Sequence, residues 1–333
     1  MTMTETDAAA GTTQELSTAA AIERAIAEEM RRDPTVYMMA TSYPDGDLLS
    51  EFGSRRIRRT PISETAFTGA AIGSAVRGLR PIVWWRNATF SLVAFDQVVN
   101  HAAKYRYMFG GQAKVPVVMR ATSGSGFQLA AQHSQSPHSI YAHVPGLKVV
   151  LPSCASDALG LMKSAIRDEN PVIFLEPGRV DSLTELVPVE ETDPVPLGTA
   201  RTLRSGDAAT LVAFGYLVHV AGEAAAELAK DGIEVDLIDP RTVTPLDTEA
   251  IRSSVRRTGR LVVVDEAPAR CSIASEVAAV TTEDRETFAA LRAPVRRLCG
   301  ADAPTAFNRV LEAKALPSSE DIVGAVREAL DAY

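Results

Sequence analysis

Cysteine is scarce in this sequence of 333 residues, and its scarcity excludes two kinds of site. Cys154, Cys271 and Cys299 are odd in number and far apart, so they match neither the CxxC pairs of metal sites nor a disulfide framework. Unpaired cysteines are typical of proteins in a reducing compartment. We therefore expect a cytoplasmic protein.

Long apolar runs and targeting segments are also missing. No run approaches the roughly 18 apolar residues that a membrane span needs. Residues 1–16 have neither the basic nor the apolar region of a secretion signal, and we expect them to form a disordered arm. The sequence therefore predicts no association with a membrane.

Concentrated positive charge and glycine-rich phosphate motifs are absent as well. The formal net charge is −8, and the longest basic cluster, residues 55–59, contains no aromatic residue, so no nucleic acid partner is expected. The motifs GxGxxG, GxxxxGK[ST] and GxSxG do not occur. If a phosphorylated cofactor binds, something other than such a motif must hold its phosphates.

What the sequence does contain is a repeated alternation of apolar runs and helical patterns. In the first half, apolar runs at 35–40, 80–85, 115–121, 147–152 and 171–176 alternate with helical patterns at 19–32, 64–78, 91–108 and 156–167. Ser17 or Thr18 is suited to cap the first of these helices. Such alternation predicts an α/β fold with mostly parallel sheets flanked by helices.

A change of composition separates the chain into two domains. Residues 177–206 are rich in Pro, Glu, Asp and Thr and show no sustained helical period, and the alternation of strands and helices resumes after them. We place a disordered arm at 1–16, a first domain at 17–190 and a smaller second domain at 191–333.

Three loops stand out because each follows a predicted strand of the first domain. They are "TPISE" (60–64), "WWRNATF" (84–90) and the long "TSGSGFQLAAQHSQSPHS" (122–139). Ligands of open α/β sheets collect at the carboxyl ends of strands, and long loops in compact domains are often functional. The sequence therefore predicts a site formed by these loops.

Glu64 and His133 are the candidate chemical groups in these loops. Glu64 precedes a helix of small residues with no Lys or Arg to pair with it, and the ordinary alternative is an acid that favours a helix N-terminus. His133 is suited to acid–base work or to hydrogen bonding with an oxyanion. His138 and His143 follow closely, without a cysteine or carboxylate in the loop, so we expect no zinc site; surface histidines are the alternative.

Several long motifs together resemble one enzyme family. They include "TPISE", "FDQVVNHAAKYRYMFGGQAKVPVVMR", "AAQHSQSPHSIYAHVPGLKVVLPS" and "IEVDLIDPRTVTPLD". Their order resembles the β subunit of the thiamine-diphosphate-dependent 2-oxo acid dehydrogenases for pyruvate, branched-chain 2-oxo acids and acetoin. The resemblance covers the chain from about residue 20 onward. It implies a pyrimidine-binding domain followed by a transketolase C-terminal-like domain.

The resemblance implies roles for particular residues. Glu64 would hydrogen bond to the pyrimidine nitrogen of thiamine diphosphate, Phe90 and Ile62 would contact the cofactor, and His133 would act near the reactive carbon. A potassium ion would be held by backbone carbonyls of Val117, Ala165, Asp168 and Asn170. An ordinary C-terminal helix turn is the alternative to that ion site.

The resemblance also implies a partner. In the family, an α subunit with a GDG-type motif holds the diphosphate and Mg²⁺, and the assembly is an α₂β₂ heterotetramer. This chain has no GDG, so it is expected to need that partner. A lipoyl acyltransferase would receive the product.

This sequence departs from the family pattern near the predicted site. Arg59 stands where an acid is usual, and Ala66 stands where a glycine is usual. The segment "VWWRNATF" is also unusual, so Trp85, Arg86 and Asn87 are candidate substrate-pocket residues, together with His138 of the long loop. Arg86 is suited to pair with an anionic substrate group, and a surface or interface arginine is the alternative. These departures leave two alternatives to the dehydrogenase: a two-subunit ketol or acyloin synthase, and a non-catalytic scaffold subunit.

Overall fold

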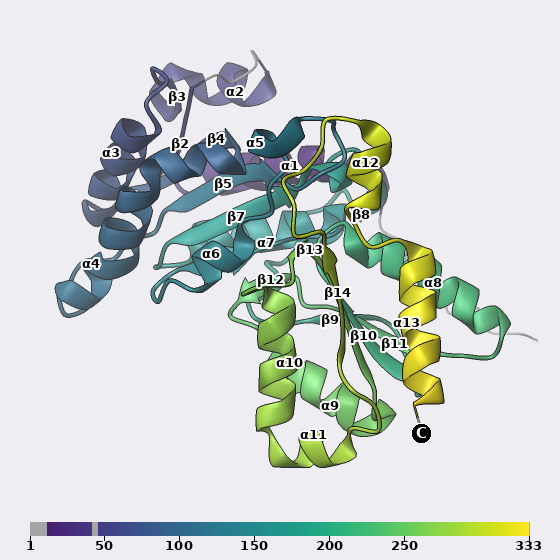
Figure 1. Cartoon of the computed structure of the whole chain (residues 1–333). Coiled ribbons are helices and arrows are strands. Elements are labelled where there is room, and N and C mark those ends of the chain that lie inside the picture. The colour runs from purple at the N-terminus through teal and green to yellow at the C-terminus, as the bar shows by residue number, and fades with distance from the viewer. Residues whose placement is uncertain (1–11, 42–45, 333) are drawn as a thin grey trace, which may run out of the picture.

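The computed structural model describes residues 12–41 and 46–332 and divides them between two main sheets. Figure 1 shows the seven-stranded sheet above the five-stranded one. The first has the order β12-β6-β7-β5-β4-β2-β3, and the second has the order β14-β13-β10-β11-β9. Every neighbouring pair is parallel except β12 with β6 and β9 with β11. The predicted α/β class with mostly parallel sheets is therefore confirmed.

The strands have the following bounds. The first sheet comprises β2 (Val36–Ala40), β3 (Ile57–Arg59), β4 (Arg80–Asn87), β5 (Val118–Ser123), β6 (Lys148–Val150), β7 (Val172–Pro177) and β12 (Thr242–Thr244). The second comprises β9 (Arg201–Arg204), β10 (Ala209–Ala213), β11 (Val235–Asp239), β13 (Leu261–Pro268) and β14 (Arg296–Gly300). A separate antiparallel pair is formed by β1 (Thr13–Ser17) and β8 (Thr184–Pro188).

Helices cover both faces of each sheet. Those of the first half are α1 (Thr18–Arg32), α2 (Asp47–Arg56), α3 (Glu64–Val76), α4 (Ala103–Met108), α5 (Ala130–His133), α6 (His138–Ala142) and α7 (Ala155–Arg167), with short helices η1 (Ala88–Ala94), η2 (Gln97–Ala102) and η3 (Gly178–Val180). Those of the second half are α8 (Leu217–Lys230), α9 (Thr248–Thr258), α10 (Ile273–Glu283), α11 (Arg285–Ala290), α12 (Arg309–Lys314) and α13 (Ser319–Asp331). In the ranges 12–41 and 46–332, none of these helices has the length and apolar character needed to cross a membrane.

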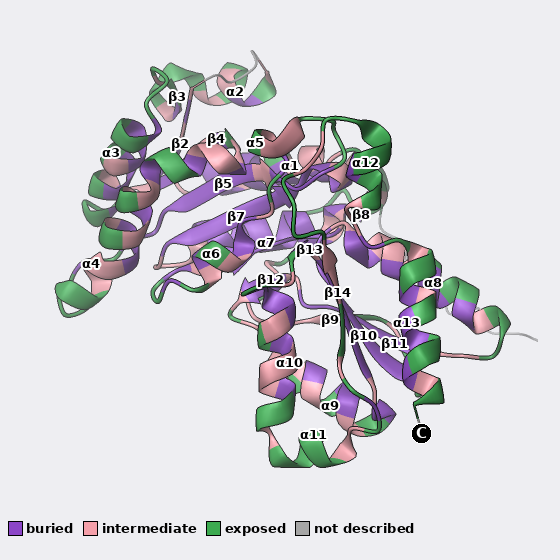
Figure 2. Ribbon diagram, in the orientation of Figure 1, coloured by how far each residue is buried: buried purple, intermediate pink, exposed green. Residues whose placement is uncertain are grey.

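The first sheet is buried on both faces because its strands carry apolar residues on both sides. One face packs against α1 and α7 through a cluster that includes Ile22, Ile26 and Leu159. The other face packs against α3 through a cluster that includes Phe67 and Met119. Figure 2 shows the resulting band of buried residues along β5 and β7. This two-sided burial is the arrangement expected of parallel strands.

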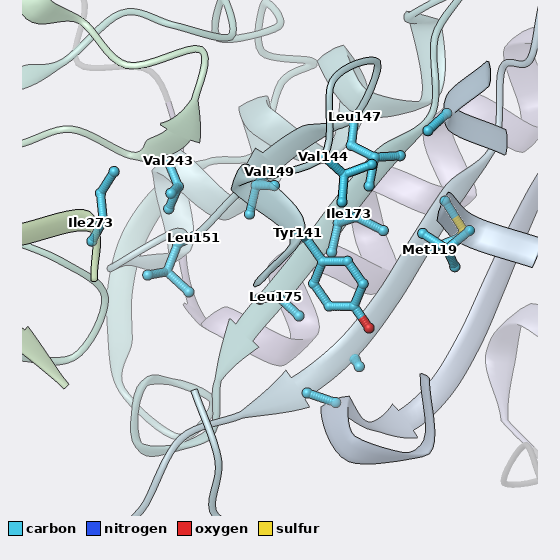
Figure 3. Close-up of a cluster of buried hydrophobic side chains, with 14 of the residues drawn as sticks. Met119, Tyr141, Val144, Leu147, Val149, Leu151, Ile173, Leu175, Val243 and Ile273 are labelled. Atoms are coloured by element: carbon cyan, nitrogen blue, oxygen red, sulfur yellow. The ribbon is translucent and has the colours of Figure 1, made fainter. Parts of the chain in front are cut away.

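The two halves of the chain share a hydrophobic cluster. Met119 and Tyr141 of the first half lie in the same cluster as Val243 and Ile273 of the second (Figure 3). In addition, β12 crosses over to pair with β6 at the edge of the first sheet. The junction between the halves is therefore apolar and continuous with the core of the first sheet.

Two local predictions differ from the structure. Thr13–Ser17, most of which falls in the segment expected to be a disordered arm, forms β1 because its backbone pairs with β8; the rest of that arm lies outside the described residues. The single helix predicted at 91–108 is divided into η1, η2 and α4. Asn87 caps η1 by accepting a hydrogen bond from the Thr89 amide, so the helical segment begins earlier and in a tighter form.

The cap predicted for the first helix is confirmed. The Ser17 hydroxyl accepts a hydrogen bond from the amide of Ala20 at 3.1 Å, which satisfies one of the free amides at the start of α1.

An ion pair lies inside the first sheet, between Arg120 of β5 and Glu176 of β7. The Nε and Nη2 atoms of Arg120 lie 2.6 and 2.9 Å from the two carboxylate oxygens of Glu176, and both side chains are buried. Burial raises the pKa of the nearby Asp181 to about 7; the charge of Glu176 adds to the rise and Arg120 opposes it. Arg120 is therefore the cation that balances this acidic region of the core.

Replacing one partner of this pair is expected to destabilise the fold. Arg120→Leu should lower the free energy of unfolding by about 3–5 kcal/mol, because Glu176 would remain buried without its counter-charge. The double variant Arg120→Leu/Glu176→Leu should recover most of that loss, as measured by urea denaturation. Arg296→Leu, which breaks an exposed pair with Glu328, is the control and should change the free energy by less than about 1 kcal/mol. Equal losses in the single and double buried variants would contradict this account.

Candidate active site

Three segments that follow strands of the first sheet come together at one place. α3 follows β3, η1 follows β4, and α5 follows β5 after the loop that begins at Gly124. η1 contacts both α3 and α5. The Thr65 hydroxyl of α3 donates a hydrogen bond to the Val93 carbonyl of η1 at 2.8 Å. The three predicted loops therefore form one site, at the carboxyl ends of parallel strands, where α/β sheets bind ligands.

Glu64 is the first residue of α3 and is buried, with 8% of its surface exposed. No hydrogen bond or ion pair reaches its carboxylate from any residue in the described part of the chain. The positive end of the α3 dipole gives it limited support. The residue is mostly buried, but its carboxylate oxygens are not among the fully enclosed polar atoms of the described residues, so they stay open to solvent or to an incoming group. This group is therefore suited to a partner from outside the chain, such as a ring nitrogen.

Phe90 and His133 lie side by side. Their rings are 5.1 Å apart, centre to centre, in an edge-to-face arrangement, and both side chains are half-buried. Phe90 packs against the core of the first sheet, which fixes its ring. The structure thus brings together the aromatic residue and the histidine that the sequence predicts near the cofactor.

Asn87 and Thr89 determine how the His133 ring is presented. The Thr89 hydroxyl donates to Asn87 Oδ1 at 2.7 Å, so its lone pair is left to face His133 Nδ1 at 3.3 Å. In the neutral ring Nδ1 then carries the proton and donates it to Thr89, which leaves Nε2 as the acceptor. Asn87 Nδ2 also donates to the His133 carbonyl at 2.8 Å. His133 is therefore oriented to take up or return a proton at Nε2.

The side chains of the predicted pocket segment 84–87 have different surroundings. The Trp85 side chain is 1% exposed and donates from Nε1 to the Thr68 hydroxyl at 2.9 Å, so it lies in the core. Arg86 is exposed, has a φ of 65° and lies with its guanidinium 5.8 Å from the Trp84 ring centre. A positive φ in a residue other than glycine is a strained conformation that often marks functional positions. Of this segment, Asn87 reaches the site through the His133 carbonyl, whereas Trp85 lies in the core. Arg86 stacks on Trp84, whose ring packs against the cluster on the α1 and α7 face of the sheet.

His138 lies apart from Phe90 and His133. It is 2% exposed, and its Nε2 lies 3.0 Å from a carboxylate oxygen of Asp265 in β13. The atoms are close but poorly aligned for a hydrogen bond, so the contact is mainly ionic. Burial lowers the pKa of His138, but the charges of Asp265 and Glu266 raise it more, and the net pKa is raised. His138 therefore takes part in the junction between the domains.

The predicted potassium carbonyls lie near the end of α7. The Val117 carbonyl accepts from the Val172 amide at 2.9 Å, and the Arg80 guanidinium donates to the Asp168 carbonyl at 3.1 Å. No cluster of His, Cys, Asp and Glu side chains arranged for a metal occurs in residues 12–41 and 46–332. The potassium site, with carbonyls of Ala165 and Asn170, stays a prediction.

Apolar side chains are exposed beside the site and farther along the same stretch of chain, at the end of α4. Ile62, in the loop before α3, is 85% exposed and so does not pack against the rest of this chain. Other exposed apolar side chains lie on η1 and at the end of α4: Leu92, Val93, Tyr107, Met108 and Phe109. We refer to these six residues as the apolar rim. Exposed apolar groups of this kind mark interaction surfaces.

Two carboxylates of the second domain hold the loop that carries His133, and no sequence motif predicted them. Glu266 accepts a hydrogen bond from the Ser125 amide, and Glu312 accepts from the amides of Gly126 at 2.8 Å and Gln128 at 3.1 Å. Burial raises the pKa of Glu266, and its bond to Ser125 opposes the rise. Each acceptor lies at least 141 positions along the sequence from the amide that it binds. Local sequence patterns carry no information over such a separation.

The same loop and the second domain enclose a cavity of about 940 Å³. Its lining includes Ala131 and Ser134, on either side of His133 in the sequence, together with Glu266, Arg270 and Leu316. The loop that carries His133 therefore contacts Phe90 on one side and borders this cavity at the domain junction on the other.

Comparisons with known proteins cover both halves of the chain. The model of the transketolase pyrimidine binding domain matches residues 14–179, and the model of the transketolase C-terminal domain matches residues 198–322. The chain is 43% identical over 335 residues to the acetoin:2,6-dichlorophenolindophenol oxidoreductase subunit beta of Cupriavidus necator, with 95% of this chain and 98% of that protein covered.

Two further matches have similar coverage. The pyruvate dehydrogenase E1 component subunit beta of Rickettsia felis is 43% identical over 316 residues, covering 92% of this chain and 96% of that protein. A solved structure described as a split gene transketolase, an inactive beta4 tetramer, matches with a TM-score of 0.79 and 25% identity, covering 95% of this chain and 98% of that chain.

Asn87 makes two interactions that mutation can separate: its Nδ2 donates to the His133 carbonyl, and its Oδ1 caps η1. Asn87→Ser retains an N-cap oxygen for Thr89 but is too short to reach the His133 carbonyl, whereas Asn87→Ala loses both interactions. We expect faster amide hydrogen exchange at residues 130–134 in both variants. Only Asn87→Ala should also lose the capping contribution, about 0.5–2 kcal/mol of unfolding free energy. Unchanged exchange at residues 130–134 in both variants would show that Asn87 does not hold this segment.

Proposed function

The chain belongs to the transketolase-like family of β subunits that includes those of pyruvate dehydrogenase E1 and acetoin oxidoreductase, and from this membership we propose that it is the β subunit of a thiamine-diphosphate-dependent 2-oxo acid dehydrogenase. It decarboxylates a 2-oxo acid and transfers the resulting acyl unit. The observation that carries the proposal is the buried, unpartnered carboxylate of Glu64 beside the segment that holds Phe90 and His133.

The residues present fit the pyrimidine half of thiamine diphosphate. Glu64 supplies a protonatable oxygen for a ring nitrogen, and Phe90 supplies an aromatic edge beside it. When bound, thiamine diphosphate supplies the carbon that attacks the substrate carbonyl and stores the electrons released by decarboxylation. Ile62 contacts the same cofactor from the loop before α3.

This chain contributes positioning and proton movement. With the cofactor bound, the Glu64 carboxyl group would hydrogen bond to the ring nitrogen. Phe90, fixed by the core, would pack against the cofactor ring and exclude water from it. His133, held at Nδ1 by Thr89, takes up or returns a proton at Nε2 beside the substrate oxygen. Arg86, positively charged at the end of β4, would be the cation that pairs with the carboxylate of the 2-oxo acid.

The active enzyme contains an α subunit that completes this site. The sequence has no glycine-rich phosphate motif, so we assign the binding of the diphosphate and Mg²⁺ to that partner. The apolar rim, with Ile62 at 85% exposure, supports docking of a second polypeptide at the site. The assembly we propose is an α₂β₂ heterotetramer, with a structural potassium ion at the carbonyls near Asp168. The three free cysteines support a cytoplasmic location.

One observation favours a second function. The solved structure that matches over 95% of the chain is described as a split gene transketolase, which shows that this architecture also occurs in enzymes named for ketol transfer. In that alternative, the acceptor of the two-carbon unit is an aldehyde, and the exposed Arg86 contacts an anionic group of the acceptor. The partner would then be an α-type subunit without a lipoyl acyltransferase.

Glu64 is the residue whose replacement tests the proposal. In the α/β pair supplied with thiamine diphosphate, Mg²⁺ and pyruvate, Glu64→Gln should lower turnover by about 10²–10⁴-fold, the range for loss of a positioned acid–base group. Turnover is followed with 2,6-dichlorophenolindophenol as the electron acceptor, and assembly by size-exclusion chromatography. Glu227→Gln makes the same chemical change at an exposed pair with Lys230 and should have no effect. Near-normal turnover of Glu64→Gln in an intact assembly would refute the assigned role.

The nature of the acceptor separates the two functions. With pyruvate as donor, we expect an isolated lipoyl domain to become acetylated, detected by mass spectrometry, because the dehydrogenase passes its acyl unit to lipoamide. Acetaldehyde in place of the lipoyl domain should yield little acetoin. Efficient acetoin formation without lipoyl acetylation would instead support the synthase.

A further inference from the structure

We propose that Glu312, on α12 of the second domain, is a positioning residue for His133: its carboxylate binds the backbone amides of the histidine loop and sets where α5 lies. The proposal rests on the proposed function only for what His133 does in the reaction. The contact itself is a property of this chain.

The first observation is the lack of packing at α5. This helix has four residues, none of them buried, and no side chain caps its start. The preceding Phe127 and Leu129 are 48% and 45% exposed. A single exposed turn of helix is not stable by itself. The position of His133 therefore depends on hydrogen bonds made by the backbone on either side of it.

The second observation is the conformation of the loop before α5. Gly124, Gly126, Gln128 and Ala130 all have φ between 55° and 114°, so every second residue is left-handed. Gln128 and Ala130 adopt this conformation at an energetic cost that glycine does not have. Alternating conformations of this kind turn successive amides toward one side, which creates a concave binding site for an anion.

The third observation is what fills this concave site. The Glu312 oxygens accept from Gly126 at 2.8 Å and from Gln128 at 3.1 Å, and the side chain is 3% exposed. Charge-assisted bonds to backbone amides are stronger than neutral ones. Gln128 precedes α5 by two residues, so this contact fixes the entry of the helix.

The exit of α5 is held from both domains. The Ser134 carbonyl accepts from the Ser125 hydroxyl at 3.1 Å and from the Thr305 hydroxyl of the second domain at 3.4 Å. Asn87 of the first domain holds the His133 carbonyl. Glu266 binds only the Ser125 amide, farther from α5, whereas Glu312 binds the two amides nearer to it. Glu312 is itself held in place by α12, whose start Asn308 caps by accepting from the Val310 and Leu311 amides.

Amide hydrogen exchange of the full chain in its assembled form tests the contact without any need for activity. Glu312→Gln keeps the size of the side chain but turns an amide N–H₂ toward one of the loop amides. Exchange in peptides covering residues 125–134 should become about tenfold faster while peptides in β5 and β7 stay unchanged. Glu328→Gln, an exposed carboxylate of the same domain, is the matched control and should leave all of these rates unchanged. Unchanged exchange at residues 125–134 in Glu312→Gln would overturn the proposal.

A double-mutant cycle distinguishes positioning from general structural support. If Glu312 acts through His133, turnover of Glu312→Gln/His133→Ala should equal that of His133→Ala alone. A double variant slower by the product of the two single losses would overturn the positioning role. If the wild-type α/β pair turns over neither 2-oxo acids nor aldehydes, the proposed function fails, and the exchange experiment still decides the role of Glu312.

A milder variant keeps the proposal testable if Glu312→Gln does not fold. Glu312→Asp keeps the negative charge but withdraws it by one methylene, so exchange at residues 125–134 should rise by less than in Glu312→Gln. An assembled Glu312→Asp with wild-type exchange and with turnover reduced as far as in His133→Ala would overturn the proposal.

Discussion

The site is organised around a carboxylate that the chain buries and leaves without a partner. Its oxygens keep a residual opening to solvent, so a hydrogen-bond partner from outside the chain can reach them. Glu64 is nevertheless fixed at the start of α3, because Thr65 ties that helix to η1 and the small side chains of α3 let it pack closely on the sheet. The fold therefore maintains an unsatisfied group in a defined place, which is the property that binding of an external ring nitrogen requires.

The rest of the site follows from how the two domains meet. The junction is apolar at its centre, where Tyr141 and Ile273 share one cluster, and polar where the long loop passes. An exposed loop with left-handed residues gains little from burial, so its place is determined by the groups that accept its amide hydrogens. Those groups, Glu266 and Glu312, belong to the second domain. The second domain thus contributes to the site indirectly, by fixing the backbone that carries the histidine.

The sequence predicted the class of fold and the family, because both depend on patterns repeated along the chain. Continuous apolar runs indicated buried parallel strands, and the segments around Glu64 and His133 indicated the family that the comparisons confirm. Details that depend on contacts between distant residues were not predictable. Trp85 was placed in the pocket, yet its indole lies in the core against Thr68, because alternate residues of a strand face opposite sides.

Hydrogen bonding also explains why His133 has a defined chemical direction in a loop with few buried groups. Asn87 Oδ1 accepts both the amide and the hydroxyl of Thr89, which leaves the hydroxyl oxygen facing Nδ1 of the ring. A ring held at Nδ1 presents the lone pair of Nε2 toward the opposite side. Asn87, at the end of β4, therefore helps to determine which nitrogen of the histidine ring carries the proton. A change in that segment alters the protonation chemistry of the site even when Glu64, Phe90 and His133 are all retained.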